Sequence, residues 1–151
     1  MKTFANHENP RVRKAFEVAS QVHAGQVDKA GVNYINHPLT VANSVGDDIS
    51  AIIVALLHDT VEDSEKTFDE LQIEIPLTPE ELQALKLLTH DKKIPYLEYV
   101  SQVKTNKLAA KVKIADLKHN SDLSRLKNPT PKDLERVKKY RHALKILETS
   151  S

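Results

Sequence analysis

The sequence contains no cysteine and no tryptophan, and only three of its 151 residues are glycine. Without cysteine the chain can form neither a disulfide nor a thiolate zinc site, and it has no cysteine nucleophile. Histidine and carboxylate side chains are therefore the ligands left for a metal site. The scarcity of glycine, together with many leucine, lysine, alanine and glutamate residues, favours helices over a turn-rich β fold.

An excess of charge of either sign is also missing. The chain has 22 lysine and arginine residues against 21 aspartate and glutamate residues, a formal net charge of +1. Such a chain has no general positive field that attracts nucleic acid or an anionic membrane surface. We therefore expect neither nucleic acid nor a membrane as a partner, and an anionic ligand has to be bound by a local pocket.

Long hydrophobic runs are absent too. The longest apolar run covers residues 51–57 and is followed at once by His58 and Asp59, which is far short of the roughly 18 apolar residues of a membrane span. The N-terminal segment MKTFANHENP lacks the apolar stretch of a secretory signal. The sequence predicts a cytoplasmic protein.

Apolar residues recur at helical spacing along most of the chain, which predicts a single all-α domain over residues 1–151 with about six to eight helices. The third of these helices, which begins after Asp47 or Asp48, is almost entirely apolar, so it should be the most buried element. We expect an irregular loop at 26–36 and a β-like stretch at 72–75. The predicted helices are 10–24, 38–45, 49–57, 68–71, 79–89, 96–104, 107–126 and 132–147.

Four residues stand out as candidate metal ligands, namely His37, His58, Asp59 and Asp116. An aspartate that directly follows an apolar run is costly to bury unless it is paired or bound to a metal. Two imidazoles and two carboxylates suit Mn²⁺, Fe²⁺, Zn²⁺ or Co²⁺, with positions left for water or substrate. The alternative is a chance His-Asp pair at a helix end, because about one such dipeptide is unsurprising in a chain of this composition.

A second His-Asp pair, His90 and Asp91, follows the helix predicted at 79–89 and precedes two lysines. A helix end of this composition is typical of a solvated surface. We therefore interpret this pair as exposed and without function.

Two further carboxylates, Glu62 and Asp63, lie four residues beyond His58 and Asp59. That spacing stacks each of them one helical turn along from its predecessor. Like charges beside a metal site are unfavourable for stability but useful in catalysis, since one carboxylate can deprotonate water and the other can protonate a leaving oxygen. The alternative is that both are ordinary exposed residues at the start of an acidic loop.

The helix predicted at 107–126 carries polar residues in partly buried positions. Asp116 and Asn120 share one face, and Lys113 precedes Asp116 by one turn. Because aspartate and asparagine are poor helix formers, such residues usually have a partner, which is either a buried hydrogen bond or a ligand.

The order of His37, the His58-Asp59 pair and Asp116 matches the H...HD...D pattern of HD-domain metal-dependent phosphohydrolases. The segments HAGQVDKAGVNYINHP, ALLHDTVED and VKIADLKHN resemble the hydrolase domain of RelA/SpoT-type enzymes and the small single-domain alarmone hydrolases. The resemblance implies a single all-helical HD domain that binds Mn²⁺ or another divalent transition metal. It also implies a nucleotide substrate, with removal of the 3′-pyrophosphate of ppGpp as the reaction and the stringent response as its setting.

Position by position, the resemblance implies four metal ligands, which are His37, His58, Asp59 and Asp116. It makes Glu62 and Asp63 the catalytic pair that positions and activates water, and Lys29 and Asn120 residues that contact the nucleotide. His23 matches a histidine that we expect to support the loop at 26–36.

Three positions depart from the alarmone-hydrolase pattern. Asp28 stands where a basic residue usually stacks on guanine, Ala30 replaces a serine, and Leu117 replaces the arginine of the usual ADR triplet. A carboxylate in place of a cation inverts the local charge beside an anionic ligand. Two alternatives therefore stay open: an HD nucleotidase that acts on another nucleotide, and a non-catalytic nucleotide- or metal-binding sensory module.

Overall fold

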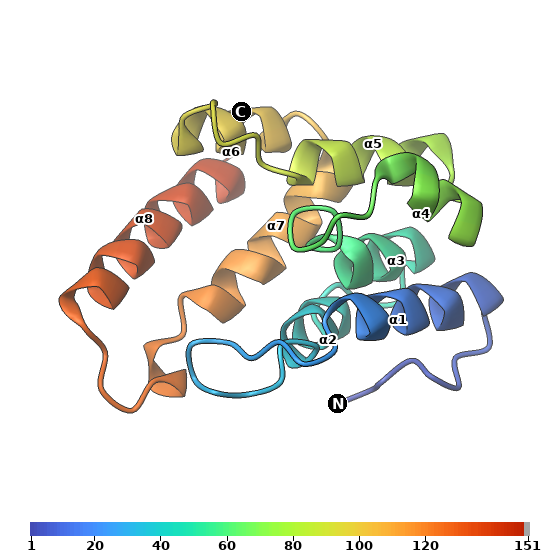
Figure 1. The fold of residues 1–151 in the computed structure, drawn as a ribbon. Coiled ribbons are helices and arrows are strands. Elements are labelled where there is room, and N and C mark those ends of the chain that lie inside the picture. The colour runs from blue at the N-terminus through green and yellow to red at the C-terminus, as the bar shows by residue number, and fades with distance from the viewer. Residues whose placement is uncertain (150–151) are drawn as a thin grey trace.

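The computed structural model describes residues 1–149, and it is all-α over that range (Figure 1). Residues 150 and 151, the last two of the domain predicted over 1–151, lie outside the described residues. Between residues 1 and 149 there is no strand, only an isolated antiparallel bridge between Val27 and Asn33. The elements are α1 Pro10–Val22, α2 Asn36–Asn43, α3 Ile49–Leu57, α4 Phe68–Glu74, α5 Pro79–Leu88, α6 Tyr96–Lys104, α7 Lys107–Asn120, the 3-10 turn η1 Leu123–Arg125, and α8 Pro131–Glu148.

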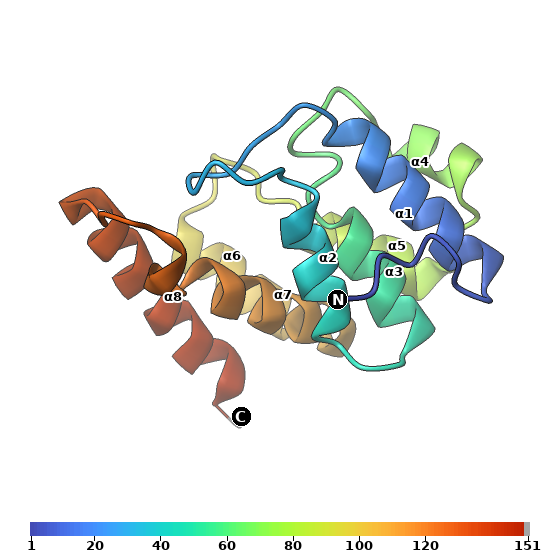
Figure 2. The same ribbon diagram turned by 90° about the horizontal axis from the view of Figure 1, so that it is seen from below.

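Helix α3 is the centre of the packing, as its apolar composition predicts. Asp48 caps it by accepting a hydrogen bond from the amide of Ala51 at 3.3 Å, and every side chain from Ala51 to Leu57 is buried. The helix packs against α1, α2, α5 and α7 (Figures 1 and 2). Burial of each leucine or isoleucine side chain contributes roughly 1.5–3 kcal/mol to the stability of the fold. The helix is therefore held firmly in the core, and with it His58, which directly follows its last residue.

Helix α7 joins the two sides of the molecule. It packs against α2, α3, α5, α6 and α8. Figure 2 shows α8 lying outside α7, away from α1 and α2. Because α2, α3 and α7 are mutual neighbours, polar residues near their ends can reach one common point.

Two boundaries differ from the sequence prediction by more than two residues. The helix predicted at 107–126 ends at Asn120, because the side chain of Asp122 accepts hydrogen bonds from Ser124 and starts the separate 3-10 turn. Such local hydrogen bonds from aspartate and serine compete with a continuing helix.

The prediction of a β-like stretch at 72–75 is wrong. Helix α4 begins at a capping box formed by Thr67 and Glu70 and continues to Glu74.

None of the helices within residues 1–149 is both long enough and apolar enough to cross a membrane.

Candidate metal centre and substrate cavity

Four side chains from three parts of the fold converge beside the end of α3. His37 lies on α2, His58 and Asp59 directly follow α3, and Asp116 lies on α7. The distance from His37 Nε2 to Asp116 Oδ1 is 2.7 Å, and His58 Nε2 lies 3.1 Å from Asp59 Oδ2 and 3.4 Å from Asp116 Oδ1. The structure therefore brings together the four residues that the sequence singles out as candidate ligands.

The donor atoms of this cluster suit a cation. One ligand atom from each of His37, His58 and Asp59 lies within 4.8 Å of the others, close enough for the three to hold a metal ion. The Nδ1–H group of His58 donates to the carbonyl of Ala55 at 2.5 Å, so in the neutral imidazole Nε2 is the nitrogen that carries the lone pair. This Nε2 is buried and has no hydrogen-bond partner, as expected of an atom that ligates a metal.

The electrostatics of the cluster also favour positive charge. Burial by itself lowers the pKa of His58, but the carboxylates of Asp59 and Asp116 outweigh burial and raise that pKa well above its usual value. Burial would raise the pKa of Asp116, but Lys113 and the two histidines hold it well below its usual range. The two aspartates therefore stay ionised, and their charge attracts either a proton on an imidazole or a metal ion.

Lys113 and Asn120 fix the orientation of Asp116. Lys113 Nζ lies 2.9 Å from Asp116 Oδ2, and Asn120 Nδ2 donates to Oδ1 at 3.1 Å. Lys113 also lies over the ring of Tyr99, with its Nζ 5.3 Å from the ring centroid. The expected pairing of the polar residues on this helix is therefore present, and it holds the carboxylate toward the cluster.

His119 is a site residue that the sequence analysis missed. Its ring stacks on His37 at 5.0 Å between centroids, and the two Nδ1 atoms are 2.7 Å apart. Burial and the neighbouring His37 lower the pKa of His119 to about 4, so its imidazole is neutral near pH 7 and accepts a hydrogen bond. A histidine ligand commonly donates its second ring N–H to such an acceptor. The only signal in the sequence is its place directly before Asn120.

The loop between α1 and α2 reaches the cluster through Tyr34. The hydroxyl of Tyr34 donates to Asp59 Oδ2 at 2.7 Å. The ring of Tyr34 packs on His23 at 4.8 Å between centroids, and His23 Nδ1 lies 2.9 Å from Gln26 Oε1. His23 therefore supports the loop, as expected, and the loop in turn orients a carboxylate of the cluster.

Glu62 and Asp63 lie on the turns that follow α3, with side chains open to solvent. The amide of Asp63 donates to the carbonyl of Asp59 at 3.0 Å, so the chain keeps a helical turn there. Partial burial and the charge of Asp59 raise the pKa of both carboxyl groups. Carboxyl groups with raised pKa values beside a cluster of metal-ligating type are suited to proton transfer.

The interpretation of His90 as an exposed helix end is wrong, although Asp91 is exposed as expected. The backbone N–H of His90 donates to Glu62 Oε1, and its ring stacks on Tyr99 at 4.4 Å. His90 Nε2 also donates to the carbonyl of Ile94 at 2.7 Å. The side chain of His90 turns inward because its ring contacts Tyr96 and Tyr99 on α6, the next helix along the chain.

Replacing His90 with alanine is expected to lower the free energy of unfolding by about 2 kcal/mol. The estimate combines a lost aromatic contact of ~0.5–1.5 kcal/mol with a lost hydrogen bond of ~1 kcal/mol. Urea denaturation measures the change. His142→Ala, at an exposed histidine of α8, is the matched control, and equal stability of the two variants would contradict the inward placement of His90.

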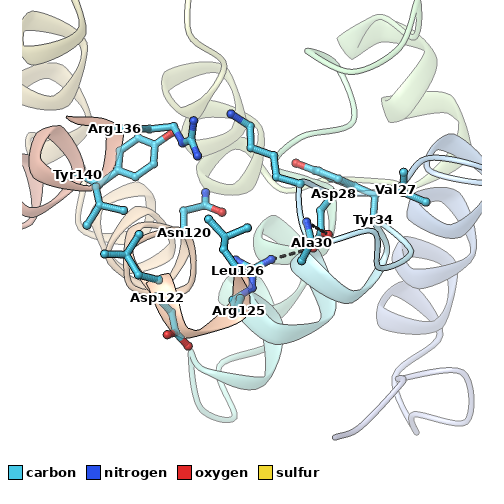
Figure 3. A pocket seen from close by; sticks show the side chains of 13 residues that line it. Val27, Asp28, Ala30, Tyr34, Asn120, Asp122, Arg125, Leu126, Arg136 and Tyr140 are labelled. Carbon is cyan, nitrogen blue, oxygen red and sulfur yellow. Dashed lines mark hydrogen bonds and ion pairs between the residues drawn. The ribbon is translucent and has the colours of Figure 1, made fainter. Parts of the chain in front are cut away.

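Two adjoining cavities open beside the cluster. One, of about 180 Å³, is lined by His58, Asp59, Glu62 and Asp116 among others. The other, of about 440 Å³, lies between the loop at 26–35, the turn η1 and helix α8 (Figure 3). Both include Asn120 and Tyr140 in their walls. A ligand can therefore span from the cluster into the larger cavity.

The larger cavity contains both residues that the resemblance assigns to nucleotide contacts, Lys29 and Asn120. Arg136 and Tyr140, which lie one turn apart on α8, also line it (Figure 3). The sequence analysis missed them because α8 has ordinary amphipathic spacing, in which such a pair is common. Of the basic residues in these walls, Arg125 is paired with Asp28 and Arg136 with Asp133, so Lys29 is the main source of uncompensated positive charge.

Asp28 does not face the larger cavity as an uncompensated charge. Its Oδ2 forms an ion pair with Arg125 at 2.8 Å, and its Oδ1 accepts hydrogen bonds from the amides of Ala30 and Val32. Burial alone would raise the pKa of Asp28, but these amides and Arg125 lower it. The inverted charge expected at this position is thus neutralised from within the chain.

Comparisons with known proteins give relatives along most of the chain, although no family model matches it. The mouse protein named guanosine-3′,5′-bis(diphosphate) 3′-pyrophosphohydrolase MESH1 is 36% identical over 146 residues, which cover 88% of this chain and 80% of that protein. The human protein of the same name is 35% identical over the same shares.

Longer proteins match over shorter segments. A probable GTP pyrophosphokinase of Mycobacterium leprae is 52% identical over 66 residues, which are 42% of this chain and 8% of that protein. The chain thus matches less than a tenth of the length of such relatives. A solved structure of a metazoan orthologue of SpoT that hydrolyses ppGpp has a TM-score of 0.72 at 21% identity, covering 93% of this chain and 86% of that one. This likeness supports the same fold.

Proposed function

Because the chain belongs to the family of the MESH1 guanosine-3′,5′-bis(diphosphate) 3′-pyrophosphohydrolases, we propose that it is a metal-dependent hydrolase that removes the 3′-pyrophosphate of ppGpp. The observation that carries this proposal is the meeting of His37, His58, Asp59 and Asp116 beside two carboxyl groups with raised pKa values. The unpartnered Nε2 of His58 supports a cation as the missing partner.

The proposed metal ligands are His37, His58, Asp59 and Asp116. Tyr34 and His119 are proposed to orient two of these ligands, because Tyr34 donates a hydrogen bond to Asp59 and His119 accepts one from His37. A divalent cation held there supplies a Lewis acid that polarises a phosphoryl oxygen and acidifies a bound water. Mn²⁺ is our proposed ion, since the mixed nitrogen and oxygen donors suit it, although affinity alone would favour later transition metals.

Glu62 and Asp63 are proposed as the pair that moves protons. Glu62 accepts a hydrogen bond from the amide of His90, which stabilises its ionised form and suits it as the base that takes a proton from water. Asp63 then gives a proton to the 3′ oxygen of the ribose when the bond from that oxygen to phosphorus breaks. The products are GDP and pyrophosphate. The water's oxygen and one of its protons stay on pyrophosphate, the 3′ oxygen of GDP takes the proton of Asp63, and the proton that Glu62 took from water then restores Asp63 through solvent.

The remaining polar residues are proposed to bind the nucleotide. Lys113, on the wall of the smaller cavity, offsets negative charge on the phosphoryl oxygens. Lys29 and Asn120, in the larger cavity, contact the nucleoside part. In this arrangement the pyrophosphate lies in the smaller cavity and the nucleoside in the larger one.

Hydrolysis assays on purified protein with added Mn²⁺ test the proposal. The substrates are ppGpp and the 5′-mono-, di- and triphosphates of guanosine and adenosine, and the products are separated as phosphate and pyrophosphate. Release of pyrophosphate from ppGpp alone is the expected result. Absence of release from every substrate would contradict the hydrolase function and favour a nucleotide-binding sensory module.

A second candidate is a nucleotidase of the same family that acts on another nucleotide. The observation that favours it is Asp28 itself, a carboxylate at the position where the resemblance places a basic residue against the guanine base. In the same assay, release of phosphate from another nucleotide, with ppGpp left intact, would decide for this candidate.

A further inference from the structure

Arg125 links two walls of the larger cavity that come from distant parts of the chain. Its Nη2 donates to Asp28 Oδ2 at 2.8 Å across 97 positions of sequence (Figure 3). Its Nη1 donates to the carbonyl of His119 at 3.0 Å. The guanidinium group is therefore held between the loop at 26–35 and the C-terminal end of α7. Two acceptors on one planar fork fix its orientation as well as its position.

Asp28 is itself fixed within the loop. Its Oδ1 accepts from the amides of Ala30 and Val32 at 2.8 and 3.1 Å, and its own amide donates to the carbonyl of Val32 at 2.8 Å. Gly31 provides the positive φ, +79°, that this tight turn requires. The turn thus presents one free carboxylate oxygen, Oδ2, toward the opposite wall, where Arg125 binds it.

The other side-chain contacts of the loop lead away from this wall. Tyr34 donates to Asp59, and Gln26 donates to the carbonyl of Asp63 at 3.4 Å, so both attach the base of the loop to the segment after α3. Among the hydrogen bonds and ion pairs formed within residues 1–149, the Arg125–Asp28 pair is the one that joins this loop to α7, η1 or α8.

We propose that the Arg125–Asp28 pair is a clip that sets the width of the larger cavity, and that Arg125 is a positioning residue for nucleotide binding. Lys29 follows Asp28 directly and lines the cavity, while Asn120 and Arg136 line the opposite side. A loop that is already held in place does not have to be ordered when the ligand binds, which improves affinity. The clip acts on binding and not on the chemical step. This proposal rests on the proposed function, because it assigns the larger cavity to the nucleotide.

Kinetics of two clip variants test the proposal. Asp28→Asn keeps an oxygen that accepts from Ala30 and Val32 but removes the charge, and Arg125→Gln removes the guanidinium fork. For ppGpp hydrolysis we expect each variant to raise KM about five- to tenfold, the equivalent of roughly 1–1.4 kcal/mol, with kcat within about twofold of wild type. In the double variant we expect KM to rise no further than in either single variant. Each single substitution already breaks the Arg125–Asp28 pair, so the two effects are not additive.

Hydrogen exchange of the backbone amides provides a readout that needs no substrate. In the free protein, amides 28–34 are expected to exchange faster in both variants than in wild type. Arg141→Gln, at an exposed arginine of α8, is the matched control for the loss of one arginine. Thermal unfolding of each variant is the check that it remains folded.

Three outcomes would overturn the clip. The first is that Arg125→Gln matches Arg141→Gln in both KM and amide exchange. The second is that KM rises in Arg125→Gln but not in Asp28→Asn, which would mean that Arg125 touches the substrate itself. The third is that kcat falls while KM is unchanged. If wild-type protein does not act on ppGpp, the proposed function fails, while amide exchange still decides whether the clip holds the loop.

Discussion

Asp116→Ala is expected to lose bound metal and thermal stability together. The substitution removes one proposed ligand, and it leaves Lys113, whose Nζ lies 2.9 Å from the Asp116 carboxylate, without its partner. Breaking a buried ion pair from one side costs about 3–5 kcal/mol, and loss of a ligand lowers metal affinity further. Metal content is measured by atomic absorption after purification in Mn²⁺, and stability by thermal unfolding with and without a chelator.

The chelator separates the two effects. Wild-type protein is expected to lose stability when the metal is removed, because a ligand that binds only the folded state stabilises it, whereas Asp116→Ala should not respond. Asp116→Asn keeps the side-chain volume and an oxygen that accepts from Lys113, so it serves if the alanine variant does not fold. Asp91→Ala, at the exposed aspartate of the second His-Asp pair, is the matched control. Normal metal content in both Asp116 variants would show that Asp116 is not a ligand.

Glu62→Gln is expected to lower kcat by roughly 10²–10⁴-fold, the usual loss when a general base is removed, with little change in KM. Glutamine keeps an oxygen that can accept from the amide of His90, so the local geometry is preserved and only the ability to take a proton is lost. The rate of pyrophosphate release at saturating substrate measures the effect. Glu65→Gln, at an exposed glutamate on the same segment, should leave kcat unchanged.

The stability of the same variant is expected to change in the opposite direction. Burial and nearby carboxylates raise the pKa of Glu62, so its ionised form is less favourable in the folded protein than in the unfolded chain. In metal-free protein at pH 7, Glu62→Gln should therefore have a higher Tm than wild type, and the difference should vanish below about pH 4, where glutamate is protonated in both states. A variant that lost both activity and stability would indicate a structural role for Glu62.

The helices were largely predictable because their signals are local. Proline or a capping side chain marks the start of several helices, and the apolar run at 51–57 becomes the buried α3. The end of α7 was predicted too late because the side chain of Asp122 ends the helix and starts the 3-10 turn. Hydrophobic spacing alone does not reveal such a hydrogen bond. The helical end of α4 was misread because β-branched and polar residues at 72–75 fit either structure.

The centre of the candidate site was predictable for a different reason. His58 and Asp59 directly follow an apolar run, and Asp116 is a charged residue on a buried helix face, so each is costly to bury unless it has a partner. The structure provides partners for both carboxylates, Tyr34 for Asp59 and Lys113 for Asp116. It also pairs His58 Nδ1 with the carbonyl of Ala55. Polar residues in unfavourable surroundings are therefore visible in the sequence even before their partners are known.

The surrounding residues could not be found in this way. His90, His119 and Arg125 lie in segments whose sequence is polar and predicts exposure. No free-energy cost of burying them is therefore apparent from the sequence. Their contacts are made with residues 28 to 97 positions away, or with rings on another helix. Only the packing of α7 against α2 and the placement of the loop at 26–35 bring these partners within reach.

The distance along the chain between the ligands has a consequence for the order of folding. His37 and Asp116 touch although 79 residues separate them, whereas α1, α2 and α3 pack on one another within the first 57 residues. Closing a longer loop costs more chain entropy, so the N-terminal helices can assemble before α7 docks. The complete ligand set then exists only after that docking step. The rate at which refolding protein acquires metal affinity would thus report the last long-range contact to form, and not the appearance of the helices.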